Sequence, residues 1–283
     1  MANEETGSAI EIVTDYDEVI NQASIKLRTL ADSAEAEYGE RILQLATLTA
    51  PEIKGIEGTG SQFRVASVRV RQPISSSAGI PEDCKPGQLF STKGGTLGDS
   101  LTFIPILRHA QRKKWTQDSQ IDCLSIDGVR GTRYGECKSC PYSQFEQGKT
   151  MECSSGHTFF VVTPELDALY RLDFQKSSAK AGKNILNLTE PPALWGKSFT
   201  LGTLHETAGG RNYYRMNTKP TGTKTPDTTM AVCELLHEFF HAQYQKALQR
   251  VLNPQETTEV PDSGTRVIIA DDDSNEVDFQ DSM

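Results

Sequence analysis

Four of the six cysteines lie in one short window, at a spacing that suits metal ligands. Cys123, Cys137, Cys140 and Cys153 are spaced C-x13-C-x2-C-x12-C. A C-x2-C pair delivers two thiolates from one tight turn, and two thiolates from flanking strands complete the tetrahedral shell that zinc prefers. The window therefore predicts a zinc knuckle over residues 123–157 that holds one structural Zn²⁺, because four thiolates leave no open position for a substrate.

Two alternatives to this ligand set remain at the level of sequence. Four cysteines can also form two disulfide bridges. The C-x2-C geometry, the sparse cysteines elsewhere and the lack of a signal-peptide pattern at the N-terminus favour metal over disulfides. His157 follows Cys153 by four residues and is an alternative fourth ligand.

A second motif of metal-binding type lies near the C-terminus. Residues 237–241 read His-Glu-Phe-Phe-His and match H-E-x-x-H, in which two histidines of a helix bind catalytic zinc and the glutamate activates water. A zinc peptidase also needs a third ligand, usually downstream, where only Glu256, Glu259 and an acidic tail remain. We therefore treat the motif as part of an ordinary amphipathic helix and expect no enzyme, with a metallopeptidase as the less favoured alternative.

Basic and aromatic residues alternate in several places, as nucleic-acid binding requires. Cations attract phosphates, and stacking of a base on an aromatic ring contributes roughly 1–3 kcal/mol. The two tryptophans, Trp115 and Trp195, are expected to be packing residues instead. The candidate nucleic-acid-binding residues are Arg69, Arg71, Arg112, Lys113, Lys114, Arg130, Arg133, Tyr134, Arg211, Tyr213, Tyr214, Arg215 and Lys219.

Charge is distributed unevenly along the chain. The net charge is −9, yet residues 61–255 hold 24 basic and 17 acidic residues, whereas residues 1–60 and 256–283 are each net −8. A basic body can attract a polyanion that the acidic ends repel or mimic. The tail after Pro254 lacks a core-forming pattern, so we expect disorder. Asp271, Asp272, Asp273 and Phe279 are its candidate partner-binding residues; a plain solubilising terminus is the alternative.

Periodicity predicts the elements that position these residues. Residues 15–48 and 227–252 have helical spacing, and 177–188 are expected to form a short helix. Strands are predicted at 62–71, 101–109, 121–126, 157–163 and 168–174, and a hairpin over 197–206 and 211–217 turns at Ala208-Gly209-Gly210. The predicted organisation is an acidic helical region (1–60), a β-rich body (61–226), an amphipathic helix (227–253) and a disordered tail (254–283). The fold class is therefore α+β, rich in strands.

Composition limits the cellular setting that we expect. The 283 residues are 36% hydrophobic and 24% charged, with no run of eighteen apolar residues. We therefore predict a cytoplasmic protein without a membrane segment, in the host cytoplasm if a phage encodes it.

The segments C-L-S-I-D-G-V-R-G (123–131) and Y-G-E-C-K-S-C-P-Y (134–142), followed by Cys153 and the strand F-F-V-V (159–162), resemble a group of tailed-phage zinc-knuckle proteins. Together with the basic body and acidic tail, the chain looks like the zinc-containing single-stranded DNA-binding proteins of bacteriophages. Those proteins use one histidine and three cysteines at a different spacing. The resemblance implies an OB-fold-like barrel with the knuckle embedded in it.

These patterns together predict a protein that binds single-stranded DNA in phage replication or recombination. Its acidic tail would recruit replication or recombination proteins. The main alternative is a zinc-knuckle transcription or replication accessory protein that acts through protein contacts. Oligomeric state and the choice between DNA and RNA stay open.

Overall fold

The computed structural model describes residues 15–48, 65–74, 79–116, 121–144, 151–189 and 193–252. The helices are α1 (Tyr16–Ser33), α2 (Ala36–Leu48), α3 (Ala179–Leu188) and α4 (Asp227–Leu252). The strands are β1 (Ala66–Val70), β2 (Leu89–Ser91), β3 (Thr96–Gly98), β4 (Ser100–Trp115), β5 (Ile121–Ser125), β6 (Arg130–Gly131), β7 (Gly135–Glu136), β8 (Cys153–Val162), β9 (Leu169–Gln175), β10 (Lys197–Ala208) and β11 (Arg211–Lys224).

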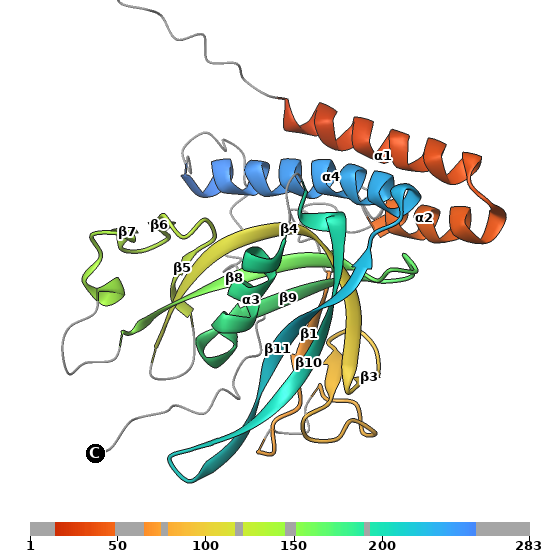
Figure 1. The fold of residues 1–283 in the computed structure, drawn as a ribbon. Coiled ribbons are helices and arrows are strands. Elements are labelled where there is room, and N and C mark those ends of the chain that lie inside the picture. Colours follow the sequence, from red (N-terminus) through yellow and green to blue (C-terminus); the bar gives the residue numbers. More distant parts are fainter. Residues whose placement is uncertain are drawn as a thin grey trace, which may run out of the picture.

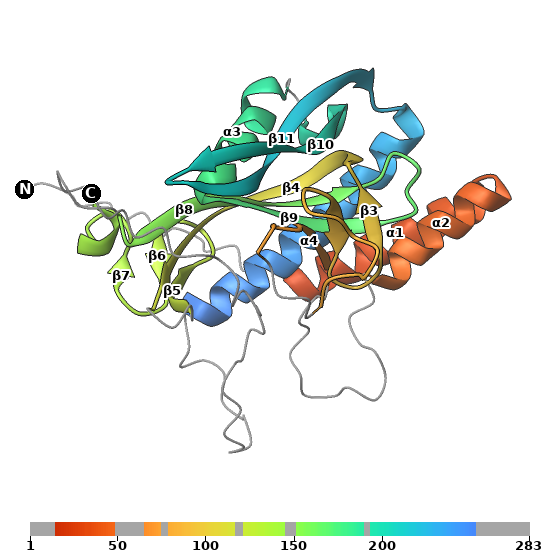
Figure 2. The same ribbon diagram turned by 90° about the horizontal axis from the view of Figure 1, so that it is seen from below.

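One large sheet organises the described chain. Its nine strands follow the order β11-β10-β4-β8-β9-β1-β2-β3, with β5 paired to β4, while β6 and β7 form a separate two-stranded sheet. The pairs are antiparallel except β1 with β9, which is parallel. The sheet curls into a half-barrel (Figures 1 and 2). The fold is therefore a strand-rich α/β architecture with flanking helices, as the sequence predicts at this coarse level.

Alternation along β8 explains why both faces of the sheet are covered. Phe159 and Val161 point into one core, whereas Phe160 and Val162 point into the core on the opposite face. Successive side chains of a strand point to opposite faces, so a strand with four consecutive apolar residues needs cover on both sides. Helices α1, α2 and α4 form a layer on one face, and α3 lies on the other (Figure 1).

The helical layer is built from apolar stripes. Leu27 of α1, Ile42 of α2 and Phe239 of α4 are fully buried, and burial of each such side chain stabilises the fold by about 1.5–3 kcal/mol. The predicted helical stretch 15–48 is two helices, because Ala34 is extended, with φ −85° and ψ 166°. The Asp15 side chain caps α1 by accepting hydrogen bonds from two backbone N–H groups of its first turn.

The predicted hairpin is confirmed, and it is longer than expected. Gly209 and Gly210 both have positive φ, 57° and 74°, which a two-residue turn between antiparallel strands favours and glycine adopts without strain. The neighbouring α3 packs against β8, β9 and the outer strand β11. The helix and its N-cap residue Ser178 bind β11: the Met216 N–H donates to Ser178 Oγ at 3.1 Å, and Thr218 Oγ1 donates to the Ala181 carbonyl at 2.7 Å. Helix α3 therefore covers a sheet edge.

Helix α4 differs in one respect from the surface helix that we expected. It packs against α1 on one side and the sheet on another, so only part of it faces solvent. In the described part of the chain, no helix is both long and apolar enough to cross a membrane. The start of the predicted strand 62–71 and the acidic tail with Asp271, Asp272, Asp273 and Phe279 lie outside the described residues.

Candidate functional site

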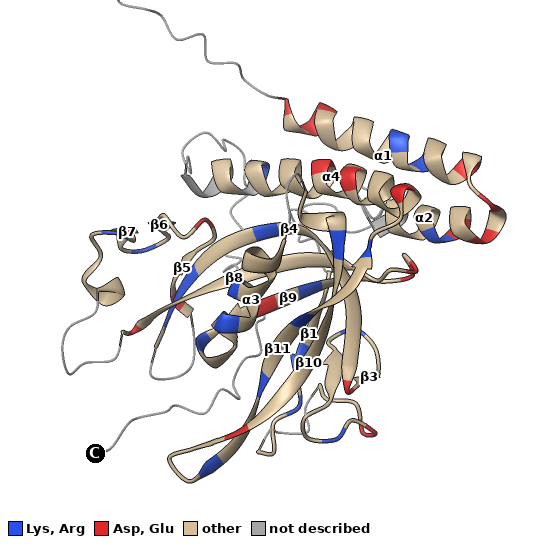
Figure 3. Cartoon of the chain, in the orientation of Figure 1, with Lys and Arg blue, Asp and Glu red and all other residues tan. Residues whose placement is uncertain are grey.

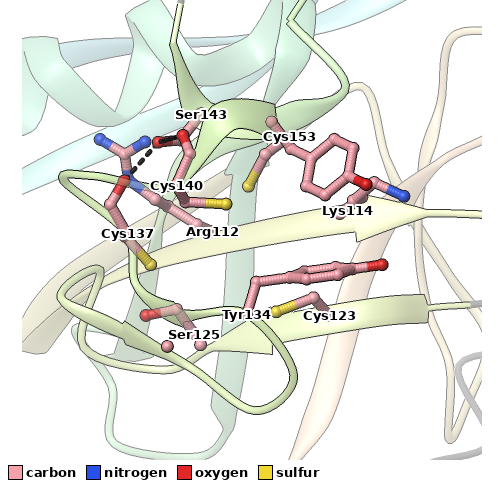
Figure 4. A pocket seen from close by; sticks show the side chains of 12 residues that line it. Arg112, Lys114, Cys123, Ser125, Tyr134, Cys137, Cys140, Ser143 and Cys153 are labelled. Atoms are coloured by element: carbon pink, nitrogen blue, oxygen red, sulfur yellow. Dashed lines mark hydrogen bonds between the residues drawn. The ribbon is translucent and has the colours of Figure 1, made fainter.

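The four clustered cysteines surround one small pocket. Cys123 lies on β5, Cys137 and Cys140 lie in the turn after β7, and Cys153 begins β8. All four line the same cavity, and their sulfurs point into it (Figure 4). All are free thiols, so the alternative of two disulfide bridges is not what the structure contains.

The chemistry of this pocket fits zinc, although its geometry is not that of a closed metal shell. Its volume of about 10 Å³ is enough for about one water molecule or one metal ion. Across the described residues, no three His, Cys, Asp or Glu side chains lie close enough together to hold a metal as placed. Coordination therefore requires the four sulfurs to move closer together. Burial raises the pKa of Cys153 to about 11, and a bound cation would reverse this shift by stabilising the thiolate.

Gly131 leaves room for the sulfur of Cys123. A Cβ at this position would lie 2.7 Å from Cys123 Sγ and 4.0 Å from Cys137 Sγ. Any larger residue would therefore displace the Cys123 sulfur. Close packing of the cysteine side chain thus explains why residue 131 is a glycine.

Asp122 organises the cations and aromatic residues of the knuckle. Its carboxylate accepts hydrogen bonds from Lys114 Nζ at 2.6 Å and from the Tyr134 hydroxyl at 2.7 Å, and it also binds the Arg133 guanidinium. Its side chain is only 5% exposed. The bonds to Lys114 and Tyr134 lower the pKa of Asp122 to about 2. Sequence reasoning missed this residue, although it directly precedes the first cysteine.

The Tyr134 ring that we predicted to stack on a base is already covered by the chain itself. Lys114 Nζ lies 5.5 Å from the Tyr134 ring and 4.4 Å from the Tyr142 ring, and the Arg133 guanidinium lies 5.4 Å from the Tyr134 ring. The two rings pack with their centroids 4.8 Å apart. The knuckle therefore satisfies most of its own charges and ring faces.

The other cations predicted to bind nucleic acid, on or next to β1, β4 and β6, do not form one surface. Arg112 lines the cysteine pocket, and Lys113 is buried at 6% exposure, so its ammonium is not a surface group as placed. Arg71 donates to the Cys84 carbonyl, and Arg69 is half-buried on β1. Arg130 is exposed at the edge of the knuckle.

The hairpin divides its predicted residues between packing and surface roles. Tyr213 donates to Glu206 Oε2 at 2.7 Å, and Arg215 binds the same carboxylate. Tyr214 packs so closely on Gly87 that a Cβ there would lie 2.6 Å from its ring. Arg211 and Lys219 are exposed. Of the three aromatic residues predicted as stacking platforms, Tyr134 and Tyr214 have rings packed against other parts of the chain, and Tyr213 is held through its hydroxyl group.

A second basic cluster, which sequence reasoning missed, lies on α3. Lys180 and Lys183 of α3 are exposed opposite its buried residues Ala181 and Ile185, and Lys176 directly precedes the helix. Between residues 176 and 224, the described chain carries eight basic residues and a single acidic one, Glu206. We call this the α3–hairpin surface (Figure 3). Its cations are Lys176, Lys180, Lys183, Lys197, Arg211, Arg215, Lys219 and Lys224.

The helical layer on the other face has the opposite charge balance. Helices α1, α2 and α4 together carry eight acidic and five basic residues. Figure 3 shows these acids on the three helices, away from the lysines of α3. The molecule therefore separates charge between the two faces of its sheet.

The H-E-x-x-H residues make contacts within the helical layer. Glu238 forms an ion pair with Lys26 of α1 at 3.7 Å, and Gln245 Nε2 lies 3.3 Å from His241 Nε2. The His237 ring lies 5.0 Å from the Trp195 ring. Nearby His109 of β4 stacks on Tyr244 at 3.5 Å, and its burial lowers its pKa to about 3. Among the described residues, none joins the two motif histidines as a third ligand.

Comparisons with known protein families, curated proteins and solved structures found no match.

Proposed function

We propose that this protein binds single-stranded DNA and that the α3–hairpin surface is the part that meets it. The observation that carries the proposal is the charge of this surface, eight basic residues against one acidic residue in the described chain. Single-stranded nucleic acid carries a dense row of phosphates, and a protein that neutralises several of them gains affinity by releasing counterions. The setting that we propose is phage DNA replication or recombination.

Local contacts support an outward role for this surface. Glu206 is the one acidic residue among the described residues of this surface, and its carboxylate is already bound by Arg215 and Tyr213, so it opposes an incoming phosphate only weakly. Lys180 contributes to lowering the pKa of Glu206, which indicates that α3 and the hairpin lie within electrostatic range of each other. A single-stranded DNA molecule could therefore contact both α3 and the hairpin at once.

The curled sheet is the platform in this proposal. In an OB-type fold, a small curled sheet and its loops hold a nucleic-acid strand. We propose the same use for this half-barrel, with α3 added along the edge of β11.

In the same proposal, the cysteine knuckle holds one structural Zn²⁺. Cys123, Cys137, Cys140 and Cys153 would be its ligands, and the metal would fix the loop that joins β5 to β8. The metal supplies rigidity here and no open coordination position. Metal analysis should find one zinc per chain, and replacement of Cys137 and Cys140 together by serine should abolish it.

Binding of a labelled oligo-dT at two salt concentrations tests the function. We expect affinity to fall steeply as the salt concentration rises. For each phosphate contact, a tenfold increase in salt lowers the logarithm of the binding constant by about 0.7. Removal of residues 256–283 should strengthen binding, since it removes a competing anionic segment. Absent or salt-insensitive binding would reject the proposal.

One observation favours a second candidate, an accessory protein that acts through protein contacts. Lys114, Tyr134 and Asp122 of the knuckle bind one another, and two apolar side chains remain at its surface, Val129 at 64% and Met151 at 47% exposure. Exposed apolar side chains beside a closed metal loop suit a protein partner. A Val129→Ser/Met151→Ser variant that keeps full oligonucleotide affinity but loses function in replication would favour this candidate.

The number of zinc ions per chain tests the peptidase alternative. A catalytic zinc at His237 and His241 would raise the metal content to two per chain and would be lost on His241→Ala. One zinc per chain that survives this substitution would remove the alternative.

A further inference from the structure

The guanidinium of Arg108 has a partner that holds it without neutralising its charge. Arg108 lies on β4, and its Nε and Nη2 atoms lie 3.2 Å and 2.9 Å from Nδ1 of His157 on β8. Arginine has N–H donors and no acceptor, so Nδ1 accepts and the imidazole carries its own proton on Nε2. Burial and the charges of Arg108 and Lys183 lower the pKa of His157, which keeps this ring neutral at neutral pH.

Other arginines of the described chain bind carboxylates instead. Arg171 binds Asp173, and Arg215 binds Glu206, so the two charges of each pair offset each other. Among the described residues, no carboxylate forms a hydrogen bond or an ion pair with Arg108. Burial lowers the pKa of Arg108, because water solvates its charged form less well there. A half-buried cation without a counter-charge is stabilised by an anion that binds it.

Strand register places this pair on the face of the sheet that α3 covers. Between β4 and β8, Arg108 pairs with Phe159, and Ala110 pairs with His157. Side chains of paired residues lie on the same face, and Phe159 belongs to the core that α3 covers. Helix α3 also packs on the imidazole, because a Cβ at Gly182 would lie 3.1 Å from His157 Cδ2. Arg108 therefore lies on the same face as α3 and its lysines.

Lys183 brings a second positive charge to the same place. It follows Gly182 on α3 and is exposed, and its charge acts on His157. The guanidinium and the ammonium group therefore act on one neutral imidazole from two different elements. A planar guanidinium matches the oxygens of a phosphate, and an ammonium group adds a point charge. Such a pair suits a phosphate and does not suit a cation or an apolar group.

We propose that Arg108 and Lys183 bind one backbone phosphate of a bound single strand and that His157 is the positioning residue that fixes the Arg108 guanidinium. The nucleic-acid source of the phosphate rests on the function proposed above. This role also accounts for His157, the alternative zinc ligand of the sequence, which is not among the residues that line the cysteine pocket. A phosphate here extends the DNA path from the lysines of α3 onto β4.

Removal of the guanidinium should lower both the affinity and its salt dependence. We expect Arg108→Gln to weaken binding of labelled oligo-dT about tenfold. The slope of log binding constant against log salt should become less steep by about 0.7, the contribution of one phosphate contact. Arg28→Gln removes an exposed cation of α1 and serves as the control. The slope does not depend on the fraction of folded protein, so it separates a lost contact from a destabilised chain.

Two substitutions of the same size at His157 separate positioning from charge. His157→Asn keeps an uncharged acceptor close to the place of Nδ1, so affinity should stay within about threefold of the wild type. His157→Asp keeps an acceptor but adds a negative charge that neutralises Arg108, so binding should weaken about tenfold and the salt slope should change as in Arg108→Gln. Equal losses in the two variants would show that His157 has only a structural role.

The Nε–H resonance of Arg108 tests the site without an oligonucleotide. In the full chain with isotope-labelled arginine, this resonance is identified by its loss in Arg108→Lys. We expect inorganic phosphate, at constant ionic strength, to shift the resonance, and His157→Asp to abolish that shift.

The outcomes separate this site from the proposed function. If oligo-dT binds but Arg108→Gln equals its control in affinity and slope, the Arg108 site is wrong and the function stands. If phosphate shifts the Arg108 resonance, His157→Asp abolishes that shift and no oligonucleotide binds, the phosphate site stands and its nucleic-acid source is wrong. If neither phosphate nor oligo-dT shifts the resonance, the site is wrong whatever the oligonucleotide affinity.

Discussion

The knuckle and the α3–hairpin surface contain the same residue types but use them in opposite ways. In the knuckle, Lys114, Arg133 and Tyr134 all converge on Asp122. On the α3–hairpin surface, Lys180 and Lys183 point to solvent from a helix whose other side is buried. Clusters of cations and aromatic residues in a sequence therefore indicate where charge is, and only the pairing of each residue tells whether that charge is available to a ligand.

Charge reversal should give the largest difference between the two regions. We expect Lys180→Glu/Lys183→Glu to weaken oligo-dT binding about 100-fold near 0.1 M salt, because two phosphate contacts become repulsions. The matched control is Arg130→Glu/Lys138→Glu, which reverses two exposed cations of the knuckle and should cost less than about threefold. Fluorescence anisotropy measures both, and equal losses would abolish the distinction.

If the knuckle holds the proposed zinc, loss of its central carboxylate should lower its affinity for the metal. Asp122→Ala releases Lys114, Arg133 and Tyr134 around the cysteine pocket, and loss of such supporting contacts typically lowers metal affinity roughly 10–100-fold. Competition with a chelator measures this, with Asp32→Ala on α1 as the control. Oligonucleotide affinity should change by less than about threefold. A variant that keeps its zinc affinity would show that Asp122 does not support the metal.

Acid should destabilise a third region of the molecule, the buried surroundings of His109. The pKa of His109 is lowered to about 3 by burial and by neighbouring His241 and Arg108, whereas an unfolded histidine titrates near 6.5. The unfolded chain thus binds the proton first, and stability falls as pH drops below about 6.5. Between pH 6.5 and 5 the loss should be about 2 kcal/mol in the free energy of unfolding.

Denaturant unfolding at several pH values tests this expectation. His109→Phe keeps the ring stack on Tyr244 and should flatten the pH dependence, whereas His205→Phe on the exposed hairpin should not. Zinc content measured on the same samples separates this effect from metal release. An unchanged slope in His109→Phe would place the acid sensitivity elsewhere.

The smallest expected effect concerns Tyr134. A ring that stacks on a base contributes roughly 1–3 kcal/mol, but this ring is covered by Lys114 and Arg133. Tyr134→Leu should therefore change oligo-dT affinity by less than about threefold. A loss of affinity of tenfold or more, measured by anisotropy with zinc content unchanged, would show that the knuckle is part of the DNA-binding surface.

Local features of the fold could be predicted from the sequence. Helical periodicity located α4 and the stretch that divides into α1 and α2, and Gly209-Gly210 located the hairpin turn, because these signals depend on neighbours in the chain. The cysteine spacing predicted that Cys123, Cys137, Cys140 and Cys153 would meet at one pocket. Sheet order could not be predicted, since the parallel pairing of β1 with β9 joins segments about a hundred residues apart.

The missed residues share a physical reason. Lys114 meets Asp122 at an irregularity between β4 and β5: Lys114 pairs with Cys123 and Trp115 with Ile121, so Asp122 has no partner in the ladder. Nothing in the local sequence shows where such a register shift falls. Lys180 and Lys183 carried a usable signal, since they lie opposite Ala181 and Ile185 at helical spacing. A search for cations beside aromatic residues passed over them.

Hydrogen exchange of the zinc-loaded full chain, with and without saturating oligo-dT, tests the central claim most directly. It reports on every described region at once without a substitution. We predict slower exchange in peptides from 176–188 and 211–224, with no change in peptides from 129–144. Protection confined to 129–144, or none in 176–224 while the oligonucleotide is bound, would contradict the assignment of DNA binding to the α3–hairpin surface.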